Sequence, residues 1–252
     1  MAGVDNIAEE TKEEANNVSG ALAIFAKTKS LSPVKTRLAA DIGESLAEAF
    51  YTLSVEAVAE IAKTAKKQSN NDFIPYWALA EKEAVAYKEW RDFKTIWTGE
   101  GDLGMRLHTI YSTLRKKHDY VVLIATDSPQ LEPEIIVSAT KKLNEQPESC
   151  VIGPALDGGF YLFAAKVSIP QQIWTKVKYS QSATLEELSS NLAAHGITIQ
   201  LLPSKGDVDT ASDLKPLLNA LEANHNLLPA QRKLYRWLQS QTEIINPKRS
   251  LT

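Results

Sequence analysis

Two aspartates, Asp127 and Asp209, stand where strands of a predicted α/β sheet end. Asp127 follows the apolar run VVLIA, which begins at Val121, and Pro129 prevents that strand from continuing. Ligands of open α/β sheets bind beyond the carboxyl ends of the strands, and two carboxylates at that edge suit Mg²⁺ or Mn²⁺ with phosphate oxygens completing its coordination. Asp207 is a third carboxylate nearby. The alternatives are that Asp127 begins a turn and that Asp209 caps a helix.

The loop after the first predicted strand carries the next candidates. Residues 27–37 read KTKSLSPVKTR and contain four cations, among them Lys35 and Arg37. A guanidinium fork, an ammonium group and backbone N–H groups in a polar loop suit the phosphates of a nucleotide. The loop lacks the glycine and lysine pattern of a Walker loop, and the competing interpretation is a solvated basic loop.

Two glycine-containing segments have alternative interpretations. Gly99-x-Gly101-x-x-Gly104 formally matches the dinucleotide fingerprint, which would make the protein an NAD-type oxidoreductase, although the strand before it is short. Gly158-Gly159, preceded by Asp157, either forms a plain turn or lets the backbone approach a ligand, with the carboxylate accepting hydroxyl protons.

Strands and helices alternate along the chain. This alternation predicts a three-layer α/β/α fold, with a mostly parallel mixed sheet that places residues 21–26 beside residues 121–126. We expect residues 1–19 to form a disordered acidic tail and residues 20–252 a single domain. Thr184-x-x-Glu187 has the spacing of a capping box at a helix start, and the segment after Pro229 predicts a C-terminal packing helix. The predicted strands are residues 21–26, 73–80, 95–97, 121–126, 150–153, 160–165 and 197–202.

Composition excludes several classes of function. The net charge of −3 lacks the excess of basic residues that is typical of nucleic-acid-binding proteins. No apolar run reaches the ~20 residues that span a bilayer. The single cysteine cannot form an internal disulfide, and the four histidines have no metal-ligand spacing. We therefore expect a soluble cytoplasmic protein that neither binds nucleic acid nor spans a membrane.

Five blocks in order resemble one family. They are FAK followed by VKTRL, then GEGDLGMR, TDSP, GPALDGGFYL and DVDTASDL, spread over residues 21–214. This order resembles a bacterial group of little-characterised transferases associated with radical-SAM/selenodomain proteins and related to phospholactate guanylyltransferase. That group belongs to the nucleotide-diphospho-sugar transferase superfamily, which has the glycosyltransferase-A fold. Ser32 stands where the family usually has glycine, and Phe160 where tyrosine is commoner.

The resemblance implies a role for each block. It implies that Asp127, with help from Asp209, holds the divalent metal, and that the first loop faces the nucleotide phosphates through three cations, Lys27, Lys35 and Arg37. It also implies that the base and ribose pocket is formed by Gly101, Asp102, Leu103 and Gly104. The acceptor site is implied to be formed by Asp157, Gly158 and Gly159.

We therefore predict a metal-dependent transferase with a nucleotide or nucleotide-sugar donor and a small-molecule acceptor. Asp127, Lys35 and Arg37 are its predicted catalytic residues. Glycosyl and nucleotidyl transfer both place negative charge on a leaving phosphate, so the sequence leaves both open. The alternatives are the NAD-type oxidoreductase and a nucleotide-binding module without catalysis.

Overall fold

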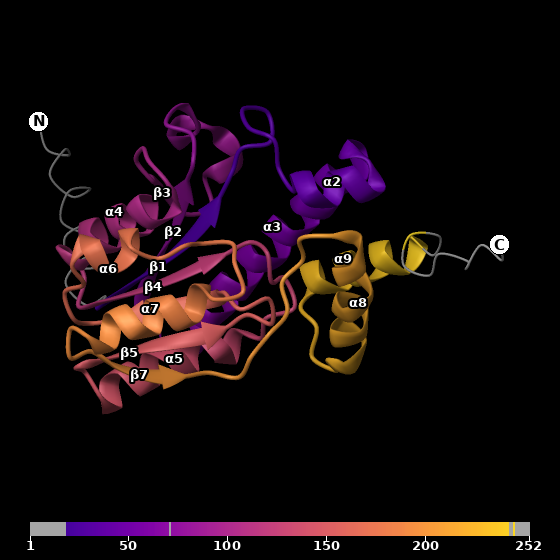
Figure 1. The fold of residues 1–252 in the computed structure, drawn as a ribbon. Coiled ribbons are helices and arrows are strands. Elements are labelled where there is room, and N and C mark those ends of the chain that lie inside the picture. The colour runs from indigo at the N-terminus through magenta and orange to yellow at the C-terminus, as the bar shows by residue number, and fades with distance from the viewer. Residues whose placement is uncertain (1–18, 71, 242–243, 245–252) are drawn as a thin grey trace, which may run out of the picture.

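One mixed sheet forms the centre of the fold. The structure, a computed structural model, describes residues 19–70, 72–241 and 244, so almost all of the predicted acidic tail lies outside the described residues. Within them, the strand order is β3-β2-β1-β4-β6-β5-β7 (Figure 1). Neighbouring strands are parallel, except that β6 runs antiparallel to both β4 and β5. The strands are β1 (Gly20–Ala26), β2 (Phe73–Leu79), β3 (Lys94–Trp97), β4 (Tyr120–Ala125), β5 (Ser149–Pro154), β6 (Phe160–Ala165) and β7 (Thr198–Leu201).

The inner strands are apolar on both faces. In β1, Leu22 and Ile24 belong to one hydrophobic cluster, and Ala21 and Ala23 to the cluster on the other side of the sheet. A strand covered on both sides reads as a continuous apolar run, which is why β1 and β4 were recognisable in the sequence. Ala21 pairs with Val121, which confirms that these two strands are neighbours.

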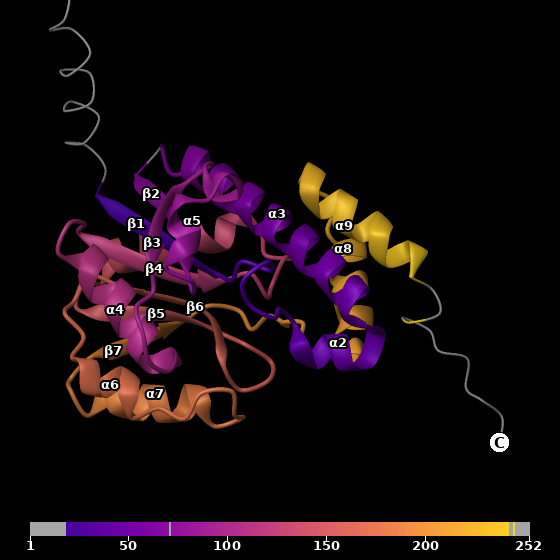
Figure 2. The same cartoon turned by 90° about the horizontal axis from the view of Figure 1, so that it is seen from above.

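Helices cover both faces of the sheet and give the three-layer α/β/α fold (Figure 2). Apolar side chains of α3 and α5 pack on one face, and those of α4, α6 and α7 pack on the other. None of the described helices is long and apolar enough to cross a membrane. The helices are α2 (Thr36–Ile42), α3 (Glu44–Gln68), α4 (Leu103–Arg115), α5 (Pro133–Glu145), α6 (Gln171–Thr175), α7 (Thr184–Ala193), α8 (Leu214–Ala223) and α9 (Pro229–Ser240), with 3₁₀ turns at Glu83–Ala86, Lys88–Trp90 and Ala211–Asp213.

A third hydrophobic cluster lies beside the sheet. It joins α2 and the first turns of α3 to α8 and α9, with Phe50, Leu234 and Leu238 buried at its centre. Helix α9, which begins at Pro229, lies along α3 and α8 (Figures 1 and 2).

Two local predictions differ from the structure. The loop after β1 ends earlier than expected, because Thr36 already begins α2 and Arg37 lies in its first turn. Thr184 does not cap α7 through a capping box. Its hydroxyl group instead donates towards the carbonyls of Lys178 and Gln181, and the Glu187 carboxylate accepts the backbone N–H of Lys178. These side chains therefore hold the loop that precedes the helix.

Candidate active site

A cleft lies at the carboxyl ends of the parallel strands. Its volume is about 580 Å³, and its lining comes from the loop after β1, the ends of β2 and β4, and the start of α4. The predicted residues that line it are Lys27, Lys35, Arg37, Leu103, Asp127 and Asp209. The structure thus brings residues more than 180 positions apart in sequence to one edge of the sheet, where ligands of such sheets bind.

Lys35 is the centre of an ion-pair network in this cleft. Its Nζ lies 2.6 Å from Asp127 Oδ1 and 3.9 Å from Asp209 Oδ1, and it donates to the backbone carbonyl of Val208. Arg37 Nη2 lies 2.8 Å from Asp209 Oδ2. The Lys35 side chain is only 6% exposed, whereas that of Asp127 is 41% exposed. The two cations, Lys35 and Arg37, therefore neutralise the two carboxylates of Asp127 and Asp209.

The backbone of Lys35 is in the left-handed region, with φ 48° and ψ 45°. This conformation costs a non-glycine residue free energy, and such residues persist where surrounding contacts hold them. Here the ammonium group is held by Asp127 and by the carbonyl of Val208, far along the chain. The strained backbone of Lys35 therefore occurs at the residue whose ammonium group these contacts hold in the cleft.

A second, smaller cavity of about 200 Å³ adjoins the first. Arg37, Leu103, Asp127 and Asp209 line both cavities, so the carboxylates lie at their junction. The second cavity is also lined by the turn between β5 and β6, by the first residues of β6, by the loop before α7 and by the segment after β7. Its lining includes Ala155, Asp157, Gly159, Phe160, Tyr179 and Asp207.

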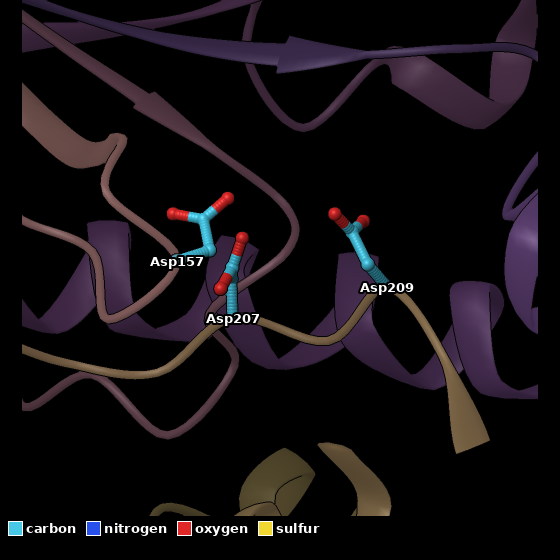
Figure 3. A group of neighbouring side chains, drawn as sticks. All are labelled: Asp157, Asp207 and Asp209. Carbon is cyan, nitrogen blue, oxygen red and sulfur yellow. The ribbon is translucent and has the colours of Figure 1, made fainter. Parts of the chain in front are cut away.

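Three carboxylates converge where these two segments meet. Asp157, Asp207 and Asp209 each place one oxygen within 4.8 Å of the others (Figure 3). The backbone joins the segments, because Leu156 N–H donates to the carbonyl of Lys205 and Lys205 N–H donates to the carbonyl of Pro154. Asp157, predicted on the acceptor side, thus lies beside the predicted metal ligand Asp209.

Burial and like charge disfavour ionisation in this cluster. Partial burial, with the negative charges of Asp157 and Asp209 close by, raises the pKa of the Asp207 carboxyl from 3.8 to about 6. Burial also raises the pKa of Asp209, although Lys35 and Arg37 oppose this shift. The cluster therefore has a surplus of negative charge that a cation would relieve.

Asp209 does not cap the following helical turn. Asp213 Oδ2 accepts the backbone N–H groups of Asp209 and Thr210 at 2.9 and 2.7 Å, so Asp213 and Thr210 form the cap. The carboxylate of Asp209 is left to face Arg37 and Lys35. Of the two interpretations that the sequence allowed for Asp209, the structure supports a place in the cleft.

The glycine run after β3 has mainly structural roles. Gly101 has φ +98°, a backbone conformation that favours glycine. Asp102 caps α4 by accepting Met105 N–H at 2.9 Å. Gly104 packs against Trp174, whose carbonyl oxygen would lie 2.7 Å from a Cβ added at this glycine. The cleft lining from this segment consists of Leu103 and Arg106. A dinucleotide-binding fingerprint follows a strand at the point in the sheet where the strand order changes direction. The glycine run instead follows β3, which lies at the edge of the sheet, so the geometry does not favour the NAD interpretation.

Three residues that line the cleft were not predicted from the sequence. Arg106 donates to the carbonyls of Gly101 and Ala80 and to Thr98 Oγ1. Glu81 accepts Thr28 N–H, and Tyr51 exchanges hydrogen bonds with the backbone of Lys27. Glu81 follows β2 as Asp127 follows β4, so the rule that selected Asp127 would also have selected Glu81.

The residues present fit a divalent metal ion. Asp157, Asp207 and Asp209 offer hard carboxylate oxygens within 4.8 Å of one another, and Asp127 lines the same cavity. Burial, with the negative charges of Asp157 and Asp209 close by, raises the pKa of Asp207 to about 6. The fit rests on this donor set and on its electrostatics.

Comparisons with known proteins agree with the fold. A model of an uncharacterised protein family conserved in bacteria (DUF2064) matches residues 61–181. None of the curated proteins matches the sequence. A crystal structure from Desulfovibrio desulfuricans G20, described as a candidate nucleotide-diphospho-sugar transferase, is 22% identical, with a TM-score of 0.77, and the match covers 90% of this chain and 97% of that one.

Two further structures are more distant. CMP:2-keto-3-deoxy-manno-octonic acid synthetase, complexed with CTP, is 15% identical, with a TM-score of 0.50 and coverage of 81% of this chain and 98% of that one. The 4-diphosphocytidyl-2C-methyl-D-erythritol synthase from Anaerococcus prevotii DSM 20548 is 10% identical, with a TM-score of 0.51 and coverage of 90% and 99%. At these identities the likeness concerns the fold. The chain therefore has the three-layer fold of the nucleotide-diphospho-sugar transferases, with its cleft at the carboxyl edge of the sheet.

Proposed function

We propose that this protein is a metal-dependent transferase that uses a nucleotide or nucleotide-sugar donor. The observation that carries the proposal is the junction of two cavities at Asp127, Asp209 and Arg37, on the edge of the sheet where this fold binds ligands. A donor in the larger cavity and an acceptor in the smaller one would meet at that junction.

The cations of the first loop bind the donor phosphates in this proposal. Lys27 is exposed in the cleft, and Arg37 is 62% exposed beyond its contact with Asp209. Transfer from a nucleotide puts negative charge on the leaving phosphate, and groups already fixed around it lower the barrier. Lys35 is fixed by its buried stem and its backbone, so its ammonium group meets this requirement.

Asp127 and Asp209 would hold the divalent ion, which would supply positive charge to the phosphate oxygens. Because Lys35 already contacts Asp127, the ion and the ammonium group compete for one carboxylate. Lys35 is then free to contact the donor when the ion is present. This arrangement would couple binding of the metal to binding of the nucleotide.

The smaller cavity would bind the acceptor. Asp157 and Gly159 line it, and a carboxylate beside an acceptor hydroxyl group can take its proton as the new bond forms. Asp157 Oδ1 accepts Gly159 N–H at 2.8 Å, which fixes the carboxylate within the turn. Phe160 and Tyr179 give the cavity apolar walls.

Binding measurements test the proposal first. Thermal shift with nucleoside triphosphates, nucleotide sugars and NAD, each with and without Mg²⁺, should show stabilisation that needs both nucleotide and metal. Stabilisation by NAD alone would contradict the proposal and favour the oxidoreductase. Analysis of the released product then separates the two reactions, because glycosyl transfer from a diphospho-sugar leaves a nucleoside diphosphate and nucleotidyl transfer leaves pyrophosphate.

The variant Asp127→Asn tests the metal assignment. It removes the charge while keeping the shape, so Mg²⁺-dependent nucleotide binding should weaken at least about tenfold, as expected for loss of a charged contact. Asp119→Asn is the matched control, since Asp119 is exposed before the same strand at the opposite edge. If Asp127→Asn binds nucleotide as tightly as wild type and still responds to Mg²⁺, the assignment is wrong.

A further inference from the structure

The inner part of the smaller cavity is apolar. Leu107 of α4 and Leu123 of β4 line it and are only 5% and 2% exposed, so they lie at its closed end. Three aromatic residues, Phe25, Phe160 and Tyr179, line it as well and pack against the hydrophobic cluster on this face of the sheet. A ligand that fills this end would gain free energy by removing apolar surface from water.

The hydroxyl groups on the walls of this cavity already have partners. The Tyr179 hydroxyl donates to the carbonyl of Trp174 at 3.0 Å, and the Tyr161 hydroxyl donates to the carbonyl of Pro203 at 2.9 Å. The Thr184 hydroxyl donates towards carbonyls of the loop before α7. None of these three groups is therefore a free donor for a polar ligand.

The loop that carries Tyr179 is fixed from both sides. The Glu187 carboxylate accepts Lys178 N–H at 2.7 Å, and Thr184 Oγ1 donates to the carbonyl of Lys178 at 2.9 Å. The Tyr179 ring packs against the start of α4, since a Cβ added at Gly104 would lie 3.0 Å from its Cε2. The spacing of Thr184 and Glu187 predicted a helix cap, and the two side chains instead hold one aromatic wall of the cavity.

The open end of the cavity is acidic. Four carboxylates line it, and Arg37 is the only cation among the described residues of its lining. Arg37 is paired with Asp209 at 2.8 Å, and neither Asp157 nor Asp207 forms an ion pair within the described part of the chain. In the proposed function a divalent ion would be shared with the donor phosphates. A phosphate or carboxylate group on the acceptor would therefore meet negative charge with no cation left to pair with it.

We propose that the acceptor is a small neutral alcohol whose apolar body is about the size of one ring and which carries no phosphate or carboxylate group. The inference rests on the proposed function, which puts the acceptor in this cavity. The cavity has a volume of about 200 Å³. An apolar cavity of about 150 Å³ in another protein binds benzene, so a ring with a hydroxymethyl group fits. The ring would lie between Phe160 and Tyr179, with the hydroxyl group at the carboxylate end.

Ligand-observed NMR titrations at about pH 7.5 test the inference with four probes. Benzyl alcohol, benzyl phosphate, glycerol and glycerol 3-phosphate combine an apolar or a polar body with a neutral or an anionic group. Mg²⁺ and pyrophosphate are present throughout, and pyrophosphate stands in for the donor phosphates. We expect benzyl alcohol to bind at least about tenfold more tightly than each of the other three, because it alone satisfies both conditions.

Variants of Phe160 test the location. Of the two cavities, Phe160 lines the smaller. Phe160→Asn should weaken binding of benzyl alcohol at least about fivefold, whereas the apolar Phe160→Leu should stay within about twofold of wild type. Leu103→Gln should weaken it in the same direction, and it tolerates a polar group because Leu103 is 44% exposed. Phe93→Asn is the matched control, since Phe93 is also partly buried but packs on Trp77 in the cluster on the other face of the sheet.

The outcomes separate the inference from the proposed function. Benzyl phosphate that binds as tightly as benzyl alcohol would overturn the exclusion of anionic acceptors, and glycerol that does so would overturn the apolar body. Benzyl alcohol binding that persists unchanged in folded Phe160→Asn and Leu103→Gln would overturn the location. All three outcomes leave the transferase proposal standing. Absence of Mg²⁺-dependent nucleotide binding in the same protein samples would overturn that proposal and, with it, the identification of the ligand as an acceptor.

Discussion

Asp207 shows how a single side chain at the cleft makes stability depend on pH. Its pKa is about 6 in the folded protein, against an ordinary value of 3.8, because the group is partly buried among other carboxylates. The folded state therefore binds this proton more tightly than the unfolded state does. The resulting stabilisation is complete below about pH 4 and is lost as the pH rises through 6.

Asp207→Asn should remove this dependence. In the presence of a chelator, we expect the variant to melt at a higher temperature than wild type at pH 7 and the difference to shrink towards pH 4. Melting curves from pH 4 to 8 provide the measurement, with Asp119→Asn as a control for the loss of an exposed carboxylate. Parallel curves for wild type and Asp207→Asn would show that Asp207 carries no unfavourable charge.

Among the elements, the turn between β5 and β6 depends on Gly158. This glycine has φ +94°, and an added Cβ would lie 2.1 Å from the backbone oxygen of Ser182. Gly158→Ala should therefore lower the free energy of unfolding by about 3 kcal/mol or more, since backbone strain and a clash combine.

Gly196→Ala is the matched control for this prediction. Gly196 has φ +73°, but an added Cβ would meet nothing within 4 Å. The backbone term alone, about 1–2 kcal/mol, should then apply. Urea unfolding of both variants gives the comparison, and equal losses would mean that the contact with Ser182 relaxes without cost.

Helix α9 reaches the carboxyl edge of the sheet through Gln231. Its Nε2 donates to the carbonyls of Pro129 and Leu131 at 2.9 and 3.0 Å, in the turn that follows Asp127. Gln231→Leu should lower the free energy of unfolding by about 1–3 kcal/mol, because two buried carbonyls lose their donor. Chemical denaturation measures the loss, and Gln239→Leu, at an exposed position of α9, should stay near wild type. An unchanged stability of Gln231→Leu would show that the turn holds without the helix.

At the scale of the whole molecule, α3 links the sheet to the C-terminal helices. Its middle packs on the sheet with Val58 and Ile61, and its first turns pack on α8 and α9 with Phe50 and Leu53. We therefore expect one cooperative unfolding transition, as predicted for a single domain. Far-UV circular dichroism and tryptophan fluorescence should give the same melting temperature, and Leu238→Ala should lower both. Two separate transitions would contradict this expectation.

The sequence predicted the sheet better than it predicted the cleft. Strands covered on both faces leave long apolar runs, so β1, β4 and β6 were recognisable without contacts. Helix α2 was missed because it has seven residues and no side-chain cap at its start. The Thr184 capping box was wrong because its groups hydrogen-bond to the preceding loop instead.

The grouping of Asp157 with Asp207 depends on long-range topology. Because β6 is antiparallel to both β4 and β5, β5 runs in the same direction as β4, so the turn after β5 lies at the same carboxyl edge of the sheet as Asp127, and Ala155 then bridges to Lys205. No local pattern encodes that bridge. The roles predicted for Lys35, Asp127 and Asp209 remain predictions, although the structure brings the three side chains together.

The position of β4 in the sheet has an evolutionary consequence. Strands β3, β2 and β1 lie on one side of β4, and β6, β5 and β7 on the other. The loops that line the larger cavity come mainly from the first group, and those that line the smaller cavity mainly from the second. Mutations in the turn between β5 and β6 can therefore remodel the smaller cavity while the larger one is inherited unchanged. A lineage with this sheet could diversify one partner of a reaction at a time, and loop exchange in the laboratory can follow the same boundary.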